Sequence, residues 1–157
     1  MYGATFLVEP DSANDELIET AIDTVAKEKW PEKSKATLAK VRGNPQKCCY
    51  YSGDLKEYDG FAGMMALSAK RNQDAGHPKI VDRNPNNELS SADGKPYGGS
   101  YVNAKVDIWA QDNKWGQGIR ATLAAVQFVK DGDAFTASGP ATSEGFEEEA
   151  GSDDDLI

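Results

Sequence analysis

Residues 101–110 form the segment that most restricts the fold, because apolar side chains alternate there with polar or aromatic ones. A period of two residues is typical of a β-strand, whose successive side chains point to opposite faces. One face suits a core and carries Val102, Ala104, Val106, Ile108 and Ala110. The other face is chemically mixed and carries Tyr101, Asn103, Lys105, Asp107 and Trp109. We therefore expect a strand that buries one face and exposes the other.

A second strand is predicted over residues 115–129, after a turn at residues 112–113. Its inward positions are Ile119, Ala121 and Leu123, followed by Val126 and Phe128. The alternation changes phase at residues 124–125, which predicts a β-bulge there. Residues 130–133 have the composition of a hairpin turn, and we expect a further strand at residues 134–135.

The N-terminal part predicts one strand and two helices. Tyr2–Val8 is rich in aromatic and branched residues and stops before Pro10. Asp11 or Ser12 can cap a helix that ends at residues 30–31, with apolar positions at Leu17, Ile18, Ala21, Ile22, Val25 and Ala26. Ser34 can cap a short second helix that stops at residues 43–45. Further strands are expected at residues 46–51, 61–70 and 79–83, and a surface loop at residues 83–99.

Length and composition fit one domain with a tail. At 157 residues the chain can bury a single core. Beyond Ser138 the sequence is too poor in apolar groups to order itself, so we expect a domain at residues 1–137, with a helical insertion at about 11–42, and a disordered acidic tail at 138–157. No apolar run is long enough to span a membrane, which predicts a cytoplasmic protein with no membrane partner. The neighbouring Cys48 and Cys49 are expected to be reduced structural thiols.

Charge changes sign along the chain. The net charge is −9, and residues 144–157 carry 7 acidic residues with no Lys or Arg. Residues 9–32 have a local charge of −6, whereas residues 33–130 hold 15 basic and 9 acidic residues, a local charge of +6. Association depends on the potential within about 10 Å of the surface. The acidic total therefore does not exclude a polyanionic partner.

Catalytic chemistry has little support. The single histidine, His77, precedes Pro78 in a polar loop and has no acidic or nucleophilic residue at a catalytic spacing. Residues 94–100 are glycine-rich, but Pro96 follows Lys95 and prevents the segment from opening a helix as a phosphate loop does. The run at residues 153–155 lacks a turn that would organise cation ligands. We expect a protein that is not an enzyme and needs no metal or cofactor.

Binding to a single-stranded nucleic acid is better supported. Such a site combines cations that follow the phosphates with aromatic faces on which bases stack. The mixed face of residues 101–109 has both. The candidate contacts are Tyr101, Lys105, Trp109, Lys114, Trp115 and Arg120, with Tyr97, Lys70, Arg71, Lys79 and Arg83 as additional candidates placed by charge and loop position.

Each candidate also has a structural alternative. Tyr101 and Trp109 could instead pack under the helix of residues 11–29, and Trp115 could plug the core at the start of a strand. Lys105 and Arg120 could be solvated strand residues, as such side chains usually are.

Three stretches carry a family resemblance. They are residues 99–111 (GSYVNAKVDIWAQ), 113–119 (NKWGQGI) and 125–135 (AVQFVKDGDAF), together with the opening YGATFL. Over residues 2–135 the chain resembles phage single-stranded-DNA-binding proteins of the OB-fold type. Members of that family carry an N-terminal strand and turn before the part that corresponds to Tyr2, and this sequence lacks them.

The resemblance implies a fold and a role. The expected fold is a five-stranded antiparallel OB-type barrel, incomplete without that strand, with added α-helices. The expected role is to coat single-stranded DNA without strong sequence preference during phage DNA replication or recombination, in the cytoplasm of the host cell.

The acidic tail suggests regulation of that role. A flexible anion can occupy a basic groove until DNA displaces it, and the freed end can dock on phage or host replication proteins. The tail residues expected to act in this way are Glu147, Glu148, Glu149, Asp153, Asp154, Asp155, Leu156 and Ile157. The simpler alternative is that the tail only adds solubility.

A different class of function also fits the sequence. The exposed aromatics could form a subunit interface of a phage structural or protein-interaction module, or of a homo-oligomer. A concentration-dependent oligomer that is indifferent to oligonucleotide would favour that interpretation.

Overall fold

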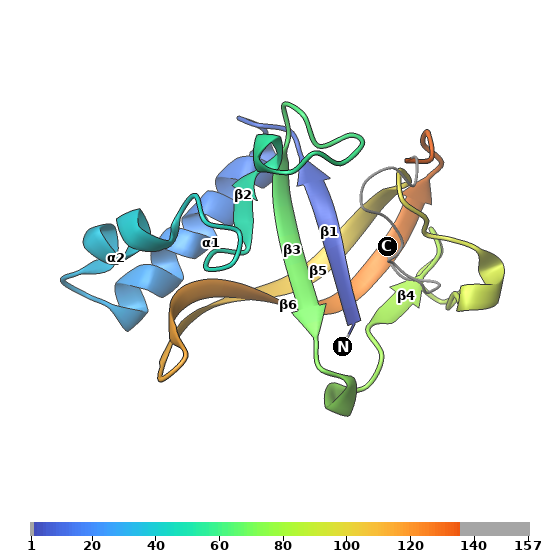
Figure 1. Ribbon diagram of the computed structural model, residues 1–157. Coiled ribbons are helices and arrows are strands. Elements are labelled where there is room, and N and C mark those ends of the chain that lie inside the picture. Colours follow the sequence, from blue (N-terminus) through green and yellow to red (C-terminus); the bar gives the residue numbers. More distant parts are fainter. Residues whose placement is uncertain (1, 136–157) are drawn as a thin grey trace.

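The computed structural model describes residues 2–135, which form one curved β-sheet and two helices (Figure 1). The elements in chain order are β1 (Tyr2–Val8), α1 (Ala13–Lys29), α2 (Ser34–Val41), β2 (Tyr50–Ser52), β3 (Met65–Arg71), β4 (Lys79–Val81), β5 (Tyr101–Asn113) and β6 (Gly116–Lys130). Short 3-10 turns lie in the loops at Gly53–Leu55, Gln73–Ala75 and Ser91–Asp93. The predicted strands and helices therefore all occur, apart from the one expected at residues 134–135.

Strand β6 organises the sheet. One edge pairs antiparallel with β5 along the whole hairpin. The other edge meets Cys48, then β3 and then β4, and all three contacts are parallel. The expected five-stranded antiparallel barrel is therefore wrong in strand number and direction, because the sheet formed by residues 2–135 has six strands and mixed pairing. A long twisted strand can exchange partners along one edge, and short-range patterns carry no information about those partners.

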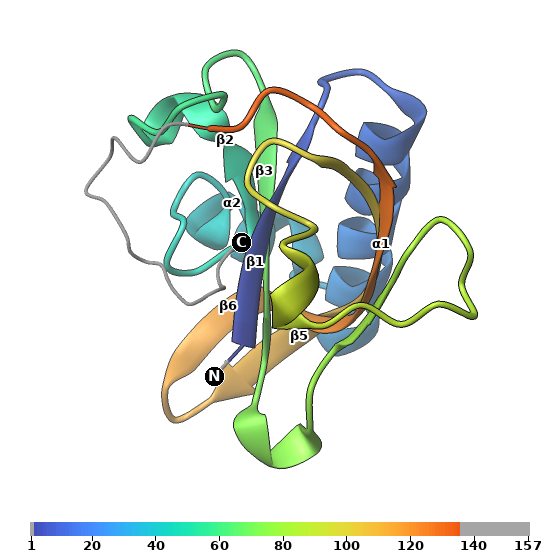
Figure 2. The same cartoon turned by 90° about the vertical axis from the view of Figure 1, so that its right-hand side faces the viewer.

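Within residues 2–135, the long strands β1 and β5 are both edge strands of the sheet. There β1 pairs with β3 alone, and β5 pairs with β6 alone. Figure 2 shows β1 and β3 standing across the long β5/β6 hairpin. None of the described strands joins β1 to β5, so closure of a barrel is not seen.

Helix α1 starts and ends where its sequence dictates. The Ser12 hydroxyl caps it by accepting a hydrogen bond from the Asp15 amide at 3.2 Å. Trp30 forms the C-cap, and its indole nitrogen donates to Asp112 Oδ2 at 2.8 Å, which ties the helix to the β5/β6 hairpin. Ile22 and Ala26 are fully buried, but Leu17 is 68% exposed, so the predicted apolar stripe is narrower than expected. Helix α2 differs slightly from prediction, because Ser34 is its first residue and Lys33 is the cap.

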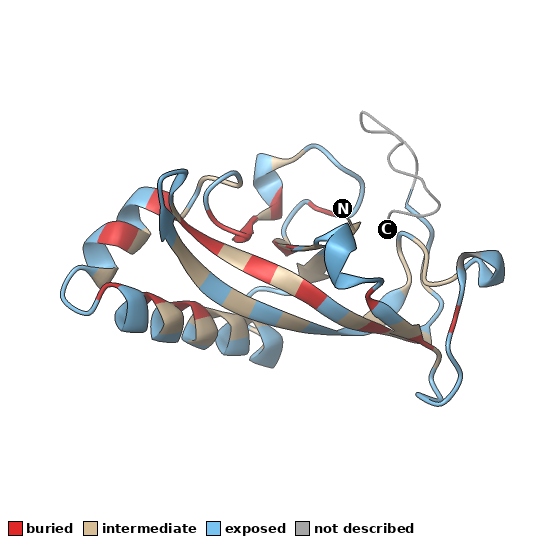
Figure 3. Cartoon of the chain, turned by 90° about the horizontal axis from the view of Figure 1, so that it is seen from below, coloured by how far each residue is buried: buried red, intermediate tan, exposed pale blue. Residues whose placement is uncertain are grey.

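The main core lies between α1 and the inner face of the sheet. Ile22 and Ala26 pack there with Leu67 of β3 and with Ile119 and Leu123 of β6. Figure 3 shows buried positions alternating along β6, while β5 has no buried position. The alternation shifts between Leu123 and Val126, opposite the register irregularity at Lys105 and Val106. The predicted β-bulge is therefore confirmed.

A polar network fastens α1 to α2 and β2. The buried Tyr50 donates its hydroxyl proton to Asp15 Oδ1 at 2.5 Å, and this hydrogen bond lowers the pKa of Asp15. Arg42, just after α2, forms a bidentate pair with Glu19 at 2.8 and 2.9 Å. Cys48 and Cys49 are buried and free, as expected, and burial raises the pKa of Cys49 to about 12.

Residues 131–135, which follow β6, fold back instead of forming another strand. The Phe135 amide donates to the Gly98 carbonyl at 3.0 Å, so residues 131–135 run beside residues 97–99. Gly99 has a φ of +105°, and a Cβ there would lie 2.0 Å from the Asp133 carbonyl oxygen. The backbones approach so closely that only glycine fits at this position. The predicted strand at residues 134–135 is absent because the segment is held against this loop.

Candidate nucleic-acid interface

The pairing around β6 gathers residues from four strands on one side of the sheet, which we call the outer face. Across three strands, Ala125 of β6 lies between Lys79 of β4 and Lys105 of β5. In the next row, Thr122 lies between Lys70 of β3 and Asp107 of β5. Trp109 is the register partner of Arg120. The outer face thus comprises Lys70, Lys79, Lys105, Asp107, Trp109, Arg120, Thr122 and Ala125.

Three lysines on this face are available for a ligand. Lys70, Lys79 and Lys105 are exposed, and no hydrogen bond or ion pair to any residue of the described range 2–135 involves their side chains. Their register places them around Thr122 and Ala125, so that their charges add locally. Flexible cations without protein partners suit contacts to phosphate oxygens.

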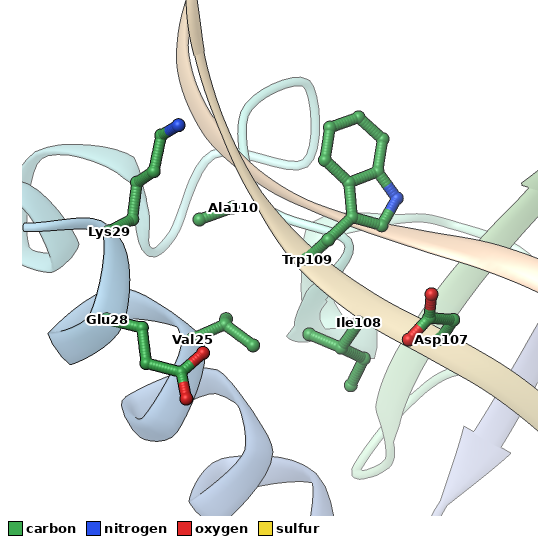
Figure 4. A pocket seen from close by; sticks show the side chains of 7 residues that line it. All are labelled: Val25, Glu28, Lys29, Asp107, Ile108, Trp109 and Ala110. Carbon is green, nitrogen blue, oxygen red and sulfur yellow. The ribbon is translucent and has the colours of Figure 1, made fainter.

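Trp109 is held in place and remains accessible. Its side chain is 42% exposed, and its indole nitrogen donates a hydrogen bond to Thr122 Oγ1 at 3.0 Å. In Figure 4, Val25 of α1 and Ile108 of β5 point toward one another, whereas Trp109 and Asp107 extend to the other side of the strand. The alternative in which Trp109 packs beneath α1 therefore does not apply. An exposed and oriented indole can act as a stacking platform for a base.

Tyr101 lies at the far end of the same strand face. It is 56% exposed, and the Lys130 ammonium lies 4.7 Å from the centre of its ring. Tyr101 and Trp109 are eight positions apart, a span of about 26 Å along an extended strand. The two aromatics and the lysines between them could accommodate several nucleotides of an extended strand.

The three candidate arginines are occupied by protein contacts. Arg71 donates to the carbonyls of Gly76 (2.9 Å), Ala75 (2.8 Å) and Leu123 (3.2 Å). Arg83 donates from Nε to the Val129 carbonyl at 2.5 Å. Arg120 bonds Gln111 Oε1 at 2.7 Å and the Gln46 carbonyl at 2.8 Å. These side chains brace loops against β6, and any DNA contact would have to use their remaining N–H groups.

The remaining candidates lie away from the outer face. The Tyr97 hydroxyl bonds Asp131 at 3.0 Å and the Gly132 carbonyl at 2.9 Å, which fixes the loop before β5. Lys114 and Trp115 form the tip of the hairpin, with the ammonium 5.1 Å from the ring centre. Trp115 is 78% exposed, so it does not plug the core.

Two contributors were not among the candidates chosen from the sequence. Thr122 orients Trp109, and Lys130 stacks on Tyr101. Their signal in the sequence was weak: Thr122 is simply an outward position on its strand, and Lys130 opens what resembled a turn. Only the β5/β6 register identifies their partners.

Other predicted features lie outside the outer face or outside the described residues. His77 contacts Tyr2, with 4.8 Å between the ring centres, at the far end of β1. Residues 2–135 contain no group of three or more His, Cys, Asp or Glu side chains that could hold a metal ion, and no helix long and apolar enough to cross a bilayer. The candidate tail residues, from Glu147 to Ile157, lie outside the described residues.

Comparison with known proteins gives consistent matches. A family model described as the single-stranded-DNA-binding protein of Enterobacter phage Enc34 matches residues 1–157. Protein p50 of Acyrthosiphon pisum secondary endosymbiont phage 1 is 43% identical over 150 residues, which covers 94% of this chain and 78% of p50.

Two solved phage proteins share the fold. The single-stranded-DNA-binding protein of bacteriophage Enc34 superposes with a TM-score of 0.68 at 25% identity, covering 90% of this chain and 75% of that one, and it has also been solved in complex with single-stranded DNA. The single-stranded-DNA-binding protein encoded by bacteriophage T7 has a TM-score of 0.52 at 13% identity, covering 94% of this chain and 85% of that one. The second likeness concerns the fold alone.

Proposed function

The chain belongs to the family of the Enterobacter phage Enc34 single-stranded-DNA-binding protein, and on this premise we propose that its outer face binds single-stranded DNA. The family is one of DNA-binding proteins and not of enzymes. In the proposed role the protein coats DNA without strong sequence preference during phage replication or recombination in the host cytoplasm.

One observation carries this proposal. Lys70, Lys79 and Lys105 come from three strands and surround two small β6 side chains, next to the oriented indole of Trp109. Cations without protein partners beside an accessible aromatic ring are the two elements that sequence-tolerant binding of single strands requires. Tyr101 with Lys130, and the hairpin tip with Lys114 and Trp115, would extend the path at either end.

We propose further that the chain is divided into a binding domain at residues 1–137 and an acidic regulatory tail at residues 138–157. The seven carboxylates of the tail would compete with phosphates for the lysines of the outer face. Its apolar end, Leu156–Ile157, would recruit replication proteins once DNA displaces it.

The test is a fluorescence titration with a single-stranded oligonucleotide. Stacking on Trp109 should quench tryptophan emission, and the affinity should fall steeply as salt rises, because phosphate contacts release counterions. A chain that ends at Ala137 should bind more tightly than the full chain at low salt. If neither chain binds at low salt, the outer face is not a DNA site.

Sedimentation distinguishes the competing function. Trp115 is exposed at the hairpin tip, and β5 offers an open edge among the described strands, features that would also suit an interface between subunits. If the chain forms an oligomer at rising protein concentration, and added oligonucleotide does not change its sedimentation, a subunit interface is the better interpretation of these features.

A further inference from the structure

Asp107 is the acidic residue of the outer face. Its side chain is exposed on the strand that also carries Lys105 and Trp109. Within residues 2–135 the structure gives its carboxylate no hydrogen-bond or ion-pair partner, although Lys105 is two residues away on the same side. The carboxylate is therefore free to interact with a ligand.

A carboxylate in this position has an electrostatic cost. It repels phosphate groups that the three nearby lysines attract. A bound strand would lower that repulsion by placing its phosphates along the lysines and its bases beside Asp107. The position of Asp107 therefore favours one orientation of a bound DNA strand, with its phosphates along the lysines and its bases toward Asp107.

The position of Trp109 indicates which base Asp107 would meet. Asp107 and Trp109 are two residues apart on one side of β5, a separation of about 7 Å along the strand. The indole reaches diagonally across to Thr122, which is the direct register partner of Asp107. Figure 4 shows the carboxylate and the indole on the same side of the strand. A base stacked on this ring therefore has a carboxylate within reach of its polar edge.

The geometry points to Asp107 as a base-selecting residue that accepts a hydrogen bond from the exocyclic amino group of the base stacked on Trp109. This inference rests on the proposed function. Cytosine presents an amino donor at the position where thymine presents a carbonyl oxygen, so the carboxylate attracts the first and repels the second. The site favours cytosine among the pyrimidines. Stacking alone does not predict this order, because the thymine methyl group adds apolar contact.

The experiment compares oligo-dC with oligo-dT of equal length. The full chain is titrated with each at low salt and mildly alkaline pH, where cytosine is not protonated. We expect oligo-dC to bind about three- to tenfold more tightly, the range of an ordinary net hydrogen bond, because water weakens a contact to a carboxylate as exposed as this one. Equal affinities for the two oligonucleotides would overturn the inference while leaving DNA binding intact.

Two variants distinguish selection of the base by Asp107 from the general effect of a negative charge on DNA affinity. Asp107→Asn removes a negative charge, so both oligonucleotides should bind more tightly, and the preference for oligo-dC should disappear because an amide can also donate to thymine. Asp23→Asn makes the same change on the exposed side of α1 and should leave the preference in place. A preference for oligo-dC that survives in Asp107→Asn would show that another group selects the base, and would overturn the inference. Failure of the wild-type chain to bind either oligonucleotide would instead overturn the proposed function.

Discussion

Trp109 and Thr122 are joined across the β5/β6 pair by a hydrogen bond of 3.0 Å from the indole nitrogen to the threonine hydroxyl. Trp109 is the register partner of Arg120, so the contact with Thr122 is a diagonal one. An exposed tryptophan normally samples several rotamers, and fixing one of them costs entropy when a ligand binds. The hydroxyl restricts the indole before DNA arrives.

The first prediction concerns this restriction. Thr122→Val keeps the side-chain shape but removes the acceptor, so the affinity for single-stranded DNA should fall about two- to fivefold. Trp109→Ala removes the stacking surface and should cost about 1–3 kcal/mol of binding free energy. Both are measured by anisotropy of a labelled oligonucleotide. Equal, negligible losses in the two variants would remove Trp109 from the binding site.

The second prediction distinguishes free from occupied cations. Log affinity falls with log salt, and Lys79→Ala and Lys105→Ala should each make this slope less steep by about 0.7. That is the value for one phosphate contact on a single strand. Their thermal stability should hardly change, because neither side chain has a protein partner among residues 2–135. An unaltered salt dependence in both variants would contradict phosphate binding by Lys79 and Lys105.

Arg71→Ala should behave in the opposite way. The guanidinium donates to three carbonyls, and removing it leaves those acceptors without their partner. We expect the free energy of unfolding to fall by about 0.5–1.5 kcal/mol, with a smaller change in the salt dependence than for the lysine variants. Urea denaturation of the variant, with Lys79→Ala as its control, measures the difference. A salt-slope change as large as that of Lys79→Ala, with no loss of stability, would instead assign Arg71 to the DNA contact.

A pH-dependent prediction follows from the contact between Tyr50 and Asp15. The tyrosine hydroxyl holds the pKa of Asp15 below its ordinary value of 3.8, so the ionised carboxylate is favoured in the folded state. The stabilisation is therefore fully present above the pKa of the unfolded chain and is lost as pH falls through the lower folded-state pKa. Tyr50→Phe should reduce the free energy of unfolding at neutral pH, and its difference from the wild type should shrink in strong acid. A pH-independent difference in urea midpoints would point to packing instead of the hydrogen bond.

The thiols of Cys48 and Cys49 should react slowly in the folded protein. Cys48 and Cys49 are buried, and burial raises the pKa of both. The thiolate is the reactive form, so alkylation of the native protein should be slow at neutral pH and should become fast in denaturant. Mass spectrometry after timed treatment with iodoacetamide measures both rates. Rapid labelling of the native chain would show that this part of the core opens often.

Local patterns predicted the elements better than their partners. The two-residue period anticipated β5 and β6 and the phase change between Leu123 and Val126, because burial of one sheet face imposes that period directly. The parallel contacts of β6 with β3 and β4 were not predictable, since they join residues 46 or more positions apart through β-pairing without a local signature. Without those contacts, Lys70 and Lys79 were candidates only by their charge and loop position.

The same limitation explains the residues whose roles differ from expectation. Arg71, Arg83 and Arg120 resemble Lys70 and Lys79 in a sequence, but each donates to a carbonyl far away along the chain. The acceptors are Leu123 and Val129 of β6 for Arg71 and Arg83, and Gln46 for Arg120. Trp115 was an alternative core residue because it stands at the start of a predicted strand, yet it lies at the hairpin tip and is 78% exposed. Long-range packing decided each case.

The β-bulge at Ala124–Ala125 allows an engineer to change the shape of the outer face without changing which residues enter the core. Deleting Ala124 would restore an unbroken alternation, and Ile119, Ala121, Leu123, Val126 and Phe128 would all still point inward. The core could therefore accept the shorter strand, whereas the twist that the extra residue adds would be lost from the outer face. Ala124 thus contributes to the curvature of the outer face, although the inward alternation of β6 does not need it.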